Sequence, residues 1–347
     1  MKHVIIGGDG FVGRHLARLL IERGEDVVIG GLSQSDLDIY RTARFVRVDV
    51  CSPAEVAALP IEPDDVVYHL AARMLVPIMP RAQRHEYFHS VNHHGTENVL
   101  RVAHERGCSK VIYFTTDMVY GRTQTIPKTE DHPRVPLGPY GGSKLASEKL
   151  CESYREQGMN VAIFRPRLII GPGRLGILAR LFRLIELNLP VPVIGNGQNH
   201  YQFISVFDCA SAALAAADRG VPNGAYNLGS LNPPAVDALL RKLIEAAGSN
   251  SMLLHVPAFL VKPALAALDL IGHPLMDPEQ YLIADEDCVV DVSKAEHELG
   301  WRPRFADDEM LLAAYAEYRK TRAAERPGPR RAVPEARGAS PQGSKTP

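Results

Sequence analysis

The sequence predicts an α/β protein, a doubly wound parallel sheet with a smaller, interleaved lobe toward the C-terminal end. Two features of the chain support this prediction. In the first half, short runs of valine and isoleucine alternate with amphipathic stretches, as a parallel sheet covered by helices requires. In the second half, the rhythm becomes irregular and richer in proline and glycine. A length of 347 residues suits one large domain with a lobe, or about two domains.

The first half contains six apolar runs with the length and composition of buried strands. We expect these strands at residues 4–6, 27–29, 45–48, 66–68, 111–114 and 161–164. Amphipathic stretches separate them, and we expect helices at residues 12–23, 53–59, 83–106 and 142–157. The second half still shows helical periodicity at residues 176–187, 208–217 and 235–247. Crossover helices lie on the faces of a parallel sheet, so we expect both faces to be covered.

Composition excludes several classes of protein. Hydrophobic residues make up 46% and charged residues 23% of the chain, which is typical of an ordinary globular protein. The formal net charge of −1 provides no field for a nucleic-acid partner. The five cysteines are widely spaced and form no CxxC pair, which indicates neither a disulfide framework nor a zinc site. With no leader peptide recognisable at the start, we expect a reducing cytoplasm.

The longest apolar stretch, residues 256–271, is interrupted by Lys262, Pro263 and Asp269. A membrane span needs about 20 mostly apolar residues, so we expect no span. This stretch could line a hydrophobic substrate pocket, but we expect it to be ordinary core of the smaller lobe.

Three histidines, His85, His89 and His93, fall on one face of an expected helix. Because no set of acidic or cysteine partners beyond Glu86 is near them in sequence, we expect no metal site. The polar face they form suits solvent or a dimer surface, and we expect a homodimer. Asn92 in the same segment is a candidate for the cofactor side of this helix.

A glycine-rich loop follows the first expected strand and opens the first expected helix. Its GxxGxxG spacing is typical of dinucleotide binding. Gly7 permits the tight turn, Gly10 lets the backbone approach a pyrophosphate, and Gly13 lets helix and strand pack closely. The acid that usually binds the adenosine ribose should end the second strand, where this chain has Gly30 and Gly31.

The missing ribose acid leaves the choice between NAD and NADP open. Without it, repulsion of a 2′-phosphate disappears, yet no arginine or lysine follows immediately to attract one. Asp49, after the third expected strand, is a candidate acceptor for the adenine amino group.

On these observations we assign residues 1–164 to a dinucleotide-binding domain, with a returning segment at about 201–228. The smaller substrate lobe takes residues 165–200 and 229–322. Residues 323–347 contain five prolines and almost no large apolar side chain, and we expect a disordered tail.

Two segments carry groups suited to proton transfer. Tyr140 and Lys144 lie at positions i and i+4 and therefore share one helix face. A nearby ammonium ion lowers the pKa of a phenol, which then exchanges protons closer to neutral pH. Thr115 and Thr116 lie just beyond the expected strand 111–114, at the carboxyl end of the sheet where open α/β folds bind ligands.

Together these motifs resemble the extended short-chain dehydrogenases/reductases of the NAD-dependent epimerase/dehydratase family, which have a Rossmann fold. The resemblance runs from about residue 3 to about residue 318. It rests on the segments GGDGFVG (7–13), DV (49–50), HLAA (69–72), TTDMVYG (115–121), YGGSK (140–144), RP (165–166), GPG (171–173), FISVFD (203–208) and LGWRP (299–303).

The resemblance implies a role for each matching position. Tyr140 would be the acid/base, Lys144 its partner that also binds the ribose, and Thr116 the hydroxyl that bonds the reacting oxygen. The implied cofactor-binding residues are Gly7, Gly10, Phe11, Val12, Gly13, Asp49, Val50, Leu70, Ala71, Ala72, Thr115, Tyr140, Lys144 and Pro166. The implied substrate-binding residues are Asp117, Met118, Arg167 and Tyr201. The implied cofactor is NAD, with NADP not excluded, and no metal is implied.

Departures from the family pattern bear on the reaction. Family 4,6-dehydratases place a glutamate after the Thr-Asp pair, where this chain has Met118, and a thioether cannot act as a base. Sugar-nucleotide members often carry asparagine and arginine near the diphosphate, where this chain has Leu168 and Tyr201. His200 is a candidate replacement cation. These differences argue against dehydration and weaken the nucleotide-sugar assignment.

We therefore expect an NAD(P)-dependent epimerase of a nucleotide-activated sugar, which acts through a transient keto intermediate. The alternative is an NAD(P)-dependent reductase or dehydrogenase of an apolar alcohol/ketone pair. The segments 165–167 and 171–173 also resemble hydroxysteroid-dehydrogenase-like members of the superfamily, which keeps this alternative open. A cofactor-binding protein without turnover is a third reading, against which the intact Thr116, Tyr140 and Lys144 argue.

Overall fold

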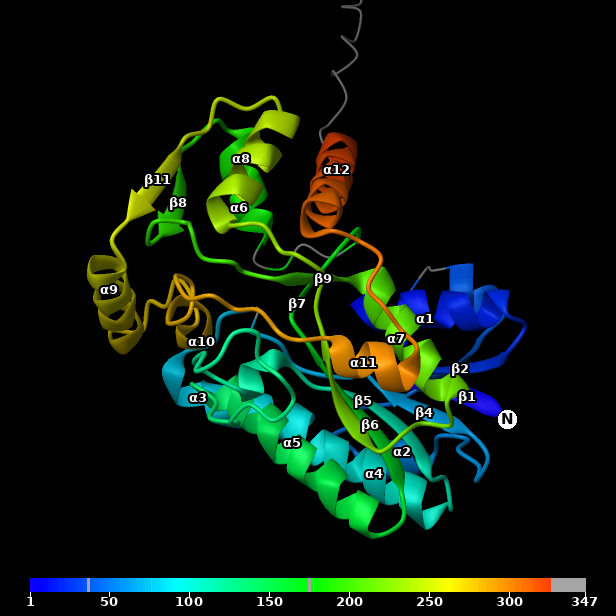
Figure 1. Ribbon diagram of the computed structural model, residues 1–347. Helices are drawn as coiled ribbons and strands as arrows, with labels where there is room; N and C mark the ends of the chain where they lie inside the picture. The colour runs from blue at the N-terminus through cyan, green and yellow to red at the C-terminus, as the bar shows by residue number, and fades with distance from the viewer. Residues whose placement is uncertain (36–37, 76, 174–175, 177, 326–347) are drawn as a thin grey trace, which may run out of the picture.

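The computed structural model describes residues 1–325 apart from 36–37, 76, 174–175 and 177. Its centre is a seven-stranded sheet in which every paired neighbour is parallel (Figure 1). The strands are β1 (Lys2–Ile6), β2 (Asp26–Gly31), β3 (Arg44–Arg47), β4 (Val66–His69), β5 (Lys110–Phe114), β6 (Asn160–Pro166) and β10 (Gly224–Leu228). The first six confirm the predicted strands, and β10 extends the sheet beyond β6.

The order of the strands reverses in the middle of the sheet. Across the sheet the order is β10-β6-β5-β4-β1-β2-β3, so β1 and β4 are neighbours. From β1 the chain builds outward to β3, and from β4 it builds outward in the opposite direction. Such a reversal leaves a crevice at the carboxyl ends of the two central strands, where open α/β sheets bind ligands. The predicted doubly wound fold class is confirmed.

Alternate side chains of each strand enter two separate cores. Ile5 and Ile112 pack in the core under α1 (Phe11–Glu22) and α7 (Val206–Asp218). Val4 and Val111 pack in the opposite core, under α2 (Pro53–Ala57), α4 (Gly95–Glu105) and α5 (Pro139–Glu156). Strands buried on both faces read as continuous apolar runs, which explains why the sequence located them.

The helix predicted for residues 83–106 is present but interrupted. It consists of α3 (Arg81–His89), a π-helical segment (Ser90–His94) and α4. π-helical insertions turn side chains away from the α-helical register and are frequent at functional sites. Here the insertion carries Asn92, which is fully buried.

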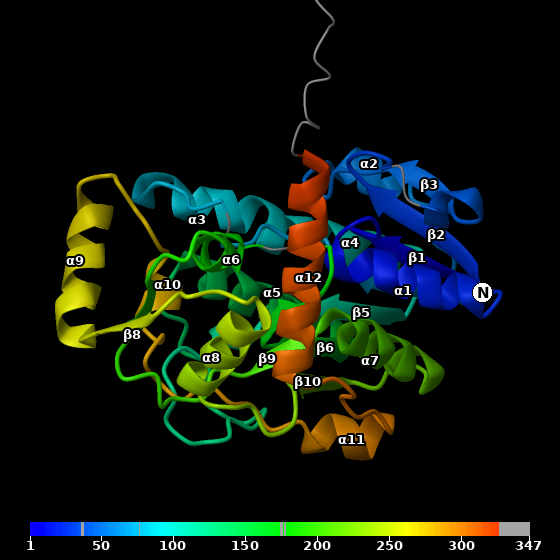
Figure 2. The ribbon, with the colours of Figure 1, turned by 90° about the horizontal axis from the view of Figure 1, so that it is seen from above.

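The smaller lobe has its own core. It contains α6 (Leu178–Glu186), α8 (Val236–Ala246) and α12 (Asp307–Glu325), which pack around Phe182, Leu243 and Tyr315. Two short parallel pairs belong to this half of the chain, β7 (Leu168–Ile170) with β9 (Phe203–Ser205) and β8 (Val191–Ile194) with β11 (Leu253–Val256). The helices α9 (Ala258–Leu270) and α10 (Pro278–Tyr281) complete it. Figure 2 shows α9 at the edge opposite the N-terminus.

The structure differs from the expected domain boundaries in two places. Residues from Val290 to Trp301, including α11 (Ser293–Leu299), were assigned to the smaller lobe but bury their apolar side chains in the core of the large sheet. The indole of Trp301 donates to Ser211 Oγ on α7 at 2.9 Å, which secures this contact. At the C-terminal end, α12 continues to Glu325, beyond the predicted start of the tail at residue 323. The remainder of that predicted tail lies outside the described residues.

None of the helices in the described part of the chain is long and apolar enough to cross a membrane.

A buried ion pair fastens α5 to the strand beside it. Arg165 on β6 donates from Nε and Nη2 to both carboxylate oxygens of Glu148 on α5, at 3.0 and 2.8 Å. Both side chains are almost fully buried. Removing one member of such a pair leaves the other charge uncompensated, which costs far more than the pair itself contributes.

We predict that Glu148→Gln lowers the free energy of unfolding by about 3–5 kcal/mol, because Arg165 keeps its charge in the interior. The matched control is Glu152→Gln, one turn further along α5, whose side chain is 39% exposed and pairs with Arg134. That exposed pair should contribute only about 0–1 kcal/mol. Urea unfolding of both variants measures the difference, and equal losses would contradict the prediction.

The first turn of α5 is capped from a distant part of the chain. No side chain from its own N-terminal residues caps this helix. Instead, the Glu279 carboxylate on α10 accepts from the backbone N–H groups of Tyr140 and Gly141, at 2.7 and 2.8 Å. A Cβ at Gly141 would lie 2.9 Å from Glu279 Oε2, so glycine is needed for this approach. Burial raises the pKa of Glu279 from its ordinary value of 4.5 to about 7.

This raised pKa predicts a pH dependence of stability. A group whose pKa rises on folding stabilises the folded state fully below its unfolded pKa, and the contribution is lost as pH rises through the folded pKa. Relative to Glu279→Gln, the wild type should therefore lose stability between about pH 4.5 and pH 7. Urea unfolding across this range measures the difference, with the exposed Glu105→Gln as control. Parallel curves for wild type and Glu279→Gln would refute the prediction.

Candidate active site

A cavity of about 1080 Å³ lies over the carboxyl ends of the central strands, between the large sheet and the smaller lobe. Except for the candidate residues Asn92 and His200, the structure brings every residue predicted for the site to this one cavity. They are Gly7, Gly10, Phe11, Val12, Gly13, Asp49, Val50, Leu70, Ala71, Ala72, Thr115, Thr116, Asp117, Met118, Tyr140, Lys144, Pro166, Arg167 and Tyr201. They come from the loops after β1, β3, β4 and β5, from the start of α1, from the end of β6 and the residue after it, from α5, and from the segment before β9.

The glycine loop has the geometry of a pyrophosphate cradle. Gly7 has φ +84°, and a Cβ at Gly13 would lie 2.3 Å from the Gly7 carbonyl oxygen, so neither position accepts another residue without a shift. Gly10 is the N-cap of α1 and provides no capping side chain. The first N–H groups of that helix are therefore available to an anion beside the cavity. These residues fit the phosphates of a dinucleotide.

The other end of the predicted cofactor site is polar. Asp49 accepts from the backbone N–H of Cys51 at 2.9 Å through Oδ1, which holds this carboxylate at the cavity wall. Asn92 accepts from the N–H of Arg73 and donates to Ser143 Oγ, at 2.8 and 3.0 Å. Asn92 thus ties the loop after β4 to α5, so the π-helical insertion has a structural use at the site.

The loop after β5 presents hydroxyl groups to the cavity. Thr116 caps the following turn, and its Oγ1 accepts from the backbone N–H of Met118 at 3.2 Å. The Thr115 hydroxyl is buried and has no hydrogen-bond partner among the described residues. A buried hydroxyl without a partner is costly, which is consistent with a polar ligand atom at this point.

Tyr140 lies on the first turn of α5 in an apolar setting. Its side chain is 3% exposed and packs in a cluster with Leu75, Phe88 and Met118. The phenol oxygen lies 3.7 Å from the sulfur of Met74. Aromatic contact with Phe88, at 5.4 Å between ring centroids, fixes the ring. The hydroxyl is therefore held at the cavity wall by packing.

Lys144 follows one turn later and is fully buried among neutral acceptors. Its Nζ donates to the Phe114 carbonyl at 2.9 Å and to the Tyr113 hydroxyl at 3.3 Å. Burial lowers the pKa of Lys144 to about 7. An ammonium group with this pKa holds its proton weakly, so bound ligand oxygens that accept hydrogen bonds would favour the charged form.

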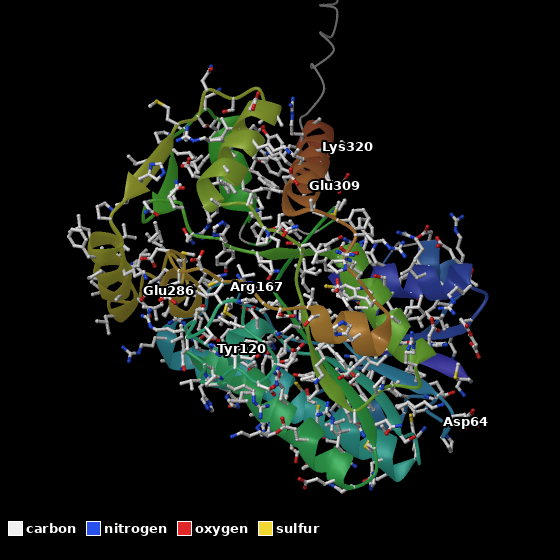
Figure 3. All side chains as sticks on the ribbon, viewed as in Figure 1. Asp64, Tyr120, Arg167, Glu286, Glu309 and Lys320 are labelled. Atoms are coloured by element: carbon white, nitrogen blue, oxygen red, sulfur yellow. The ribbon has the colours of Figure 1, made fainter. Side chains whose placement is uncertain are left out.

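A buried ion pair lies beneath the substrate side of the cavity. The Arg167 guanidinium donates to Asp117, and both side chains are buried. The guanidinium also lies over the ring of Tyr201, 4.6 Å from its centroid. Figure 3 shows Arg167 in the middle of the molecule, between the smaller lobe and the helices below the sheet. The Asp117 carboxylate is therefore engaged as the acceptor of this pair.

Apolar side chains of the smaller lobe form the opposite wall. They are Leu178, Leu181, Val193, Val236, Leu240, Val261, Leu265, Leu275 and Met276. Among the described residues the cationic side chains that line the cavity are Arg73, Lys144 and Arg167. His200, considered as a replacement cation, pairs instead with Asp287 at 3.0 Å and does not line it.

The expectation that residues 256–271 form ordinary core is wrong. In α9 the only buried residue is Asp269, which pairs with Arg84 on α3 at 2.6 Å. Phe259 and Leu270 are 75% and 68% exposed, and other side chains of the helix face the cavity. Nearly all side chains of this helix are apolar, so no continuous polar face marks which side is exposed, and periodicity could not show this.

Sequence reasoning missed several residues of the site. Asp9, Gly31 and Arg73 also line the cavity. Asp9 stands inside the recognised glycine loop, so the missing strand acid was a signal that could have led to it. Glu279 gave no local signal, because its contact with α5 spans more than a hundred residues.

In the part of the chain that the structure describes, no three histidine, cysteine or acidic residues are grouped so that they could hold a metal ion.

Comparisons with known proteins agree with this geometry. Residues 3–229 match the NAD dependent epimerase/dehydratase family. The uncharacterized protein y4nG of Sinorhizobium fredii is 30% identical over 322 residues, which are 92% of this chain and 79% of that protein. The dTDP-D-glucose 4,6-dehydratase of Mus musculus is 27% identical, with 92% of this chain and 89% of that protein covered.

A solved structure extends the comparison to three dimensions. The UDP-glucose 4-epimerase of Thermotoga maritima, in a structure with UDP-glucose, superposes with a TM-score of 0.75 at 25% identity. The match covers 92% of this chain and 99% of that one. With the family match spanning most of the chain and the expected groups meeting at one cavity, this protein belongs to the NAD-dependent epimerase/dehydratase family.

Proposed function

We propose that this enzyme epimerises a nucleotide-activated sugar through a transient keto intermediate, with NAD as its cofactor. One observation carries the proposal. Thr116, Tyr140 and Lys144 meet at the wall of the cavity that also holds the glycine loop. The relationship to nucleotide-sugar enzymes of both the epimerase and the dehydratase type supports the substrate class.

The residues of the chain divide the chemistry among them. Bound NAD supplies the acceptor for a carbon-bound hydride and its later return. Tyr140 would take the proton of the sugar hydroxyl as the hydride leaves, and Thr116 would hold the reacting oxygen by a hydrogen bond. Lys144 would stabilise the phenolate form of Tyr140 and bind ribose hydroxyls. Tyr140 would then give the proton back after the hydride returns to the other sugar face.

Inversion requires the keto intermediate to rotate in the cavity, so that it presents its other face to the cofactor. The wall of the smaller lobe is apolar and offers few directional hydrogen bonds that would hold one orientation. Two residues on the opposite wall of the cavity argue against dehydration. Met118 provides no base, and Asp117 is engaged by Arg167. The chain therefore has the groups for hydride and proton transfer, Thr116, Tyr140 and Lys144, but lacks an available acid and base for the elimination of water.

The apolar wall suits the alternative, reduction of an apolar ketone. The two reactions differ in redox stoichiometry. An epimerase returns the hydride it takes, so nicotinamide absorbance should show no net change during turnover. A reductase consumes its cofactor stoichiometrically.

We therefore predict that incubation with a panel of nucleotide sugars yields an epimer without net change in nicotinamide absorbance. A parallel panel of apolar ketones with NADH serves as the comparison. Product stereochemistry and absorbance at the nicotinamide band are followed together. Stoichiometric oxidation of NADH by a ketone, with inversion of none of the sugars, would replace the proposal by the alternative.

We also predict that Tyr140→Phe lowers turnover by at least about 10²-fold, the usual effect of losing a general acid/base, while NAD binding persists. The control is Tyr154→Phe on the same helix, whose ring contacts His104 on α4. Turnover is measured on the epimerised sugar and NAD affinity by calorimetry. Near-normal turnover of Tyr140→Phe would remove this residue from the mechanism.

A homodimer and a cytoplasmic location stay predictions from the sequence. Sedimentation of the purified chain would measure the first.

A further inference from the structure

The adenosine end of the cavity lacks the acid that the fold usually provides. β2 ends at Gly31, which lines the cavity together with Leu32 and Ser33. None of these side chains carries a charge. A dinucleotide that lies along the glycine loop places its adenosine ribose near this strand end.

The carboxylate of Asp9 occupies the space directly above that strand end. A Cβ built on Gly31 would lie 3.0 Å from Asp9 Oδ1 and 3.6 Å from its Cγ. Asp9 also lines the cavity. A side chain from the glycine loop thus stands where a side chain of residue 31 would begin, and the glycine makes room for it.

The environment of this carboxylate leaves it available to a ligand. Asp9 is half-buried and forms no ion pair with any described residue. Burial raises its pKa from the ordinary value of 3.8, and the same carboxylate contributes to the raised pKa of the nearby Tyr40. A carboxylate that is partly removed from water and has no cation beside it is stabilised by hydrogen bonds from hydroxyl groups.

We propose that Asp9 selects NAD over NADP, by accepting hydrogen bonds from the adenosine ribose hydroxyls in place of an acid at the end of β2. A 2′-phosphate in this position would bring its negative charge against the carboxylate. The sequence after Gly31 supports the same choice. The first cationic residue to follow it is Arg41, and Asp38 in between already pairs with Arg18 at 2.8 Å.

The test measures binding of NAD⁺ and NADP⁺ by calorimetry, with no substrate present. It therefore does not depend on which compound the enzyme epimerises. We expect the wild type to prefer NAD⁺. Asp9→Asn keeps the size of the side chain and removes its charge. It should weaken NAD⁺ binding by about tenfold or more, since hydrogen bonds to charged groups contribute that much, and strengthen NADP⁺ binding.

Asp38→Asn is the matched control, because it removes a carboxylate from the same region that does not line the cavity. Its ratio of NADP⁺ to NAD⁺ dissociation constants should equal that of the wild type. A wild type that prefers NADP⁺ would overturn the proposal. So would an Asp9→Asn ratio within about twofold of the wild-type ratio.

Moving the carboxylate gives a second, independent test. The double variant Asp9→Ala with Gly31→Asp carries the acid on β2, and the alanine removes the atoms that a residue 31 side chain would meet. It should recover the preference for NAD⁺ that Asp9→Asn loses. Gly31→Asp alone should bind both dinucleotides poorly, because the two carboxylates then collide. A folded double variant that accepts NADP⁺ as readily as Asp9→Asn does would contradict the proposal.

Discussion

The candidate active site depends on how the first turn of α5 is held against the sheet. Three separate parts of the chain meet there. Glu279 caps the backbone N–H groups of Tyr140 and Gly141, Asn92 bonds Ser143, and Lys144 bonds the end of β5. Each contact fixes backbone or a buried polar atom, so the phenol of Tyr140 is positioned by neighbours that are themselves constrained.

Charge is distributed unevenly around the cavity. The large sheet contributes buried groups that are paired or hydrogen-bonded, with Arg167 on Asp117 and Lys144 on carbonyl and hydroxyl oxygens. The smaller lobe contributes mainly apolar side chains. Proton transfer and cofactor binding need fixed polar groups, whereas an intermediate that rotates within the cavity needs a surface with few directional contacts. The two lobes therefore suit different parts of one reaction.

At the adenosine end of the cavity, the carboxylate of Asp9 in the glycine loop lies where the fold usually has the side chain of an acid at the end of β2. Gly31 and Asp9 are far apart in sequence, yet a Cβ built on Gly31 would lie 3.0 Å from Asp9 Oδ1. A search for the acid only at the end of β2 does not find a carboxylate that comes from the glycine loop. The structure reveals this carboxylate because Asp9 fills the space that a side chain at position 31 would need.

The sequence by itself determined the parallel sheet, its six predicted strands and the pairing of Tyr140 with Lys144 on one helix turn. Strands buried on both faces are continuous apolar runs, and Tyr140 and Lys144 lie within one helix turn, so both signals are local. Only the tertiary structure decided the cap by Glu279, the place of Asp9, the packing of residues 290–301 on the large sheet and the exposure of α9. These depend on contacts between distant segments, for which hydrophobic periodicity and residue spacing carry no information.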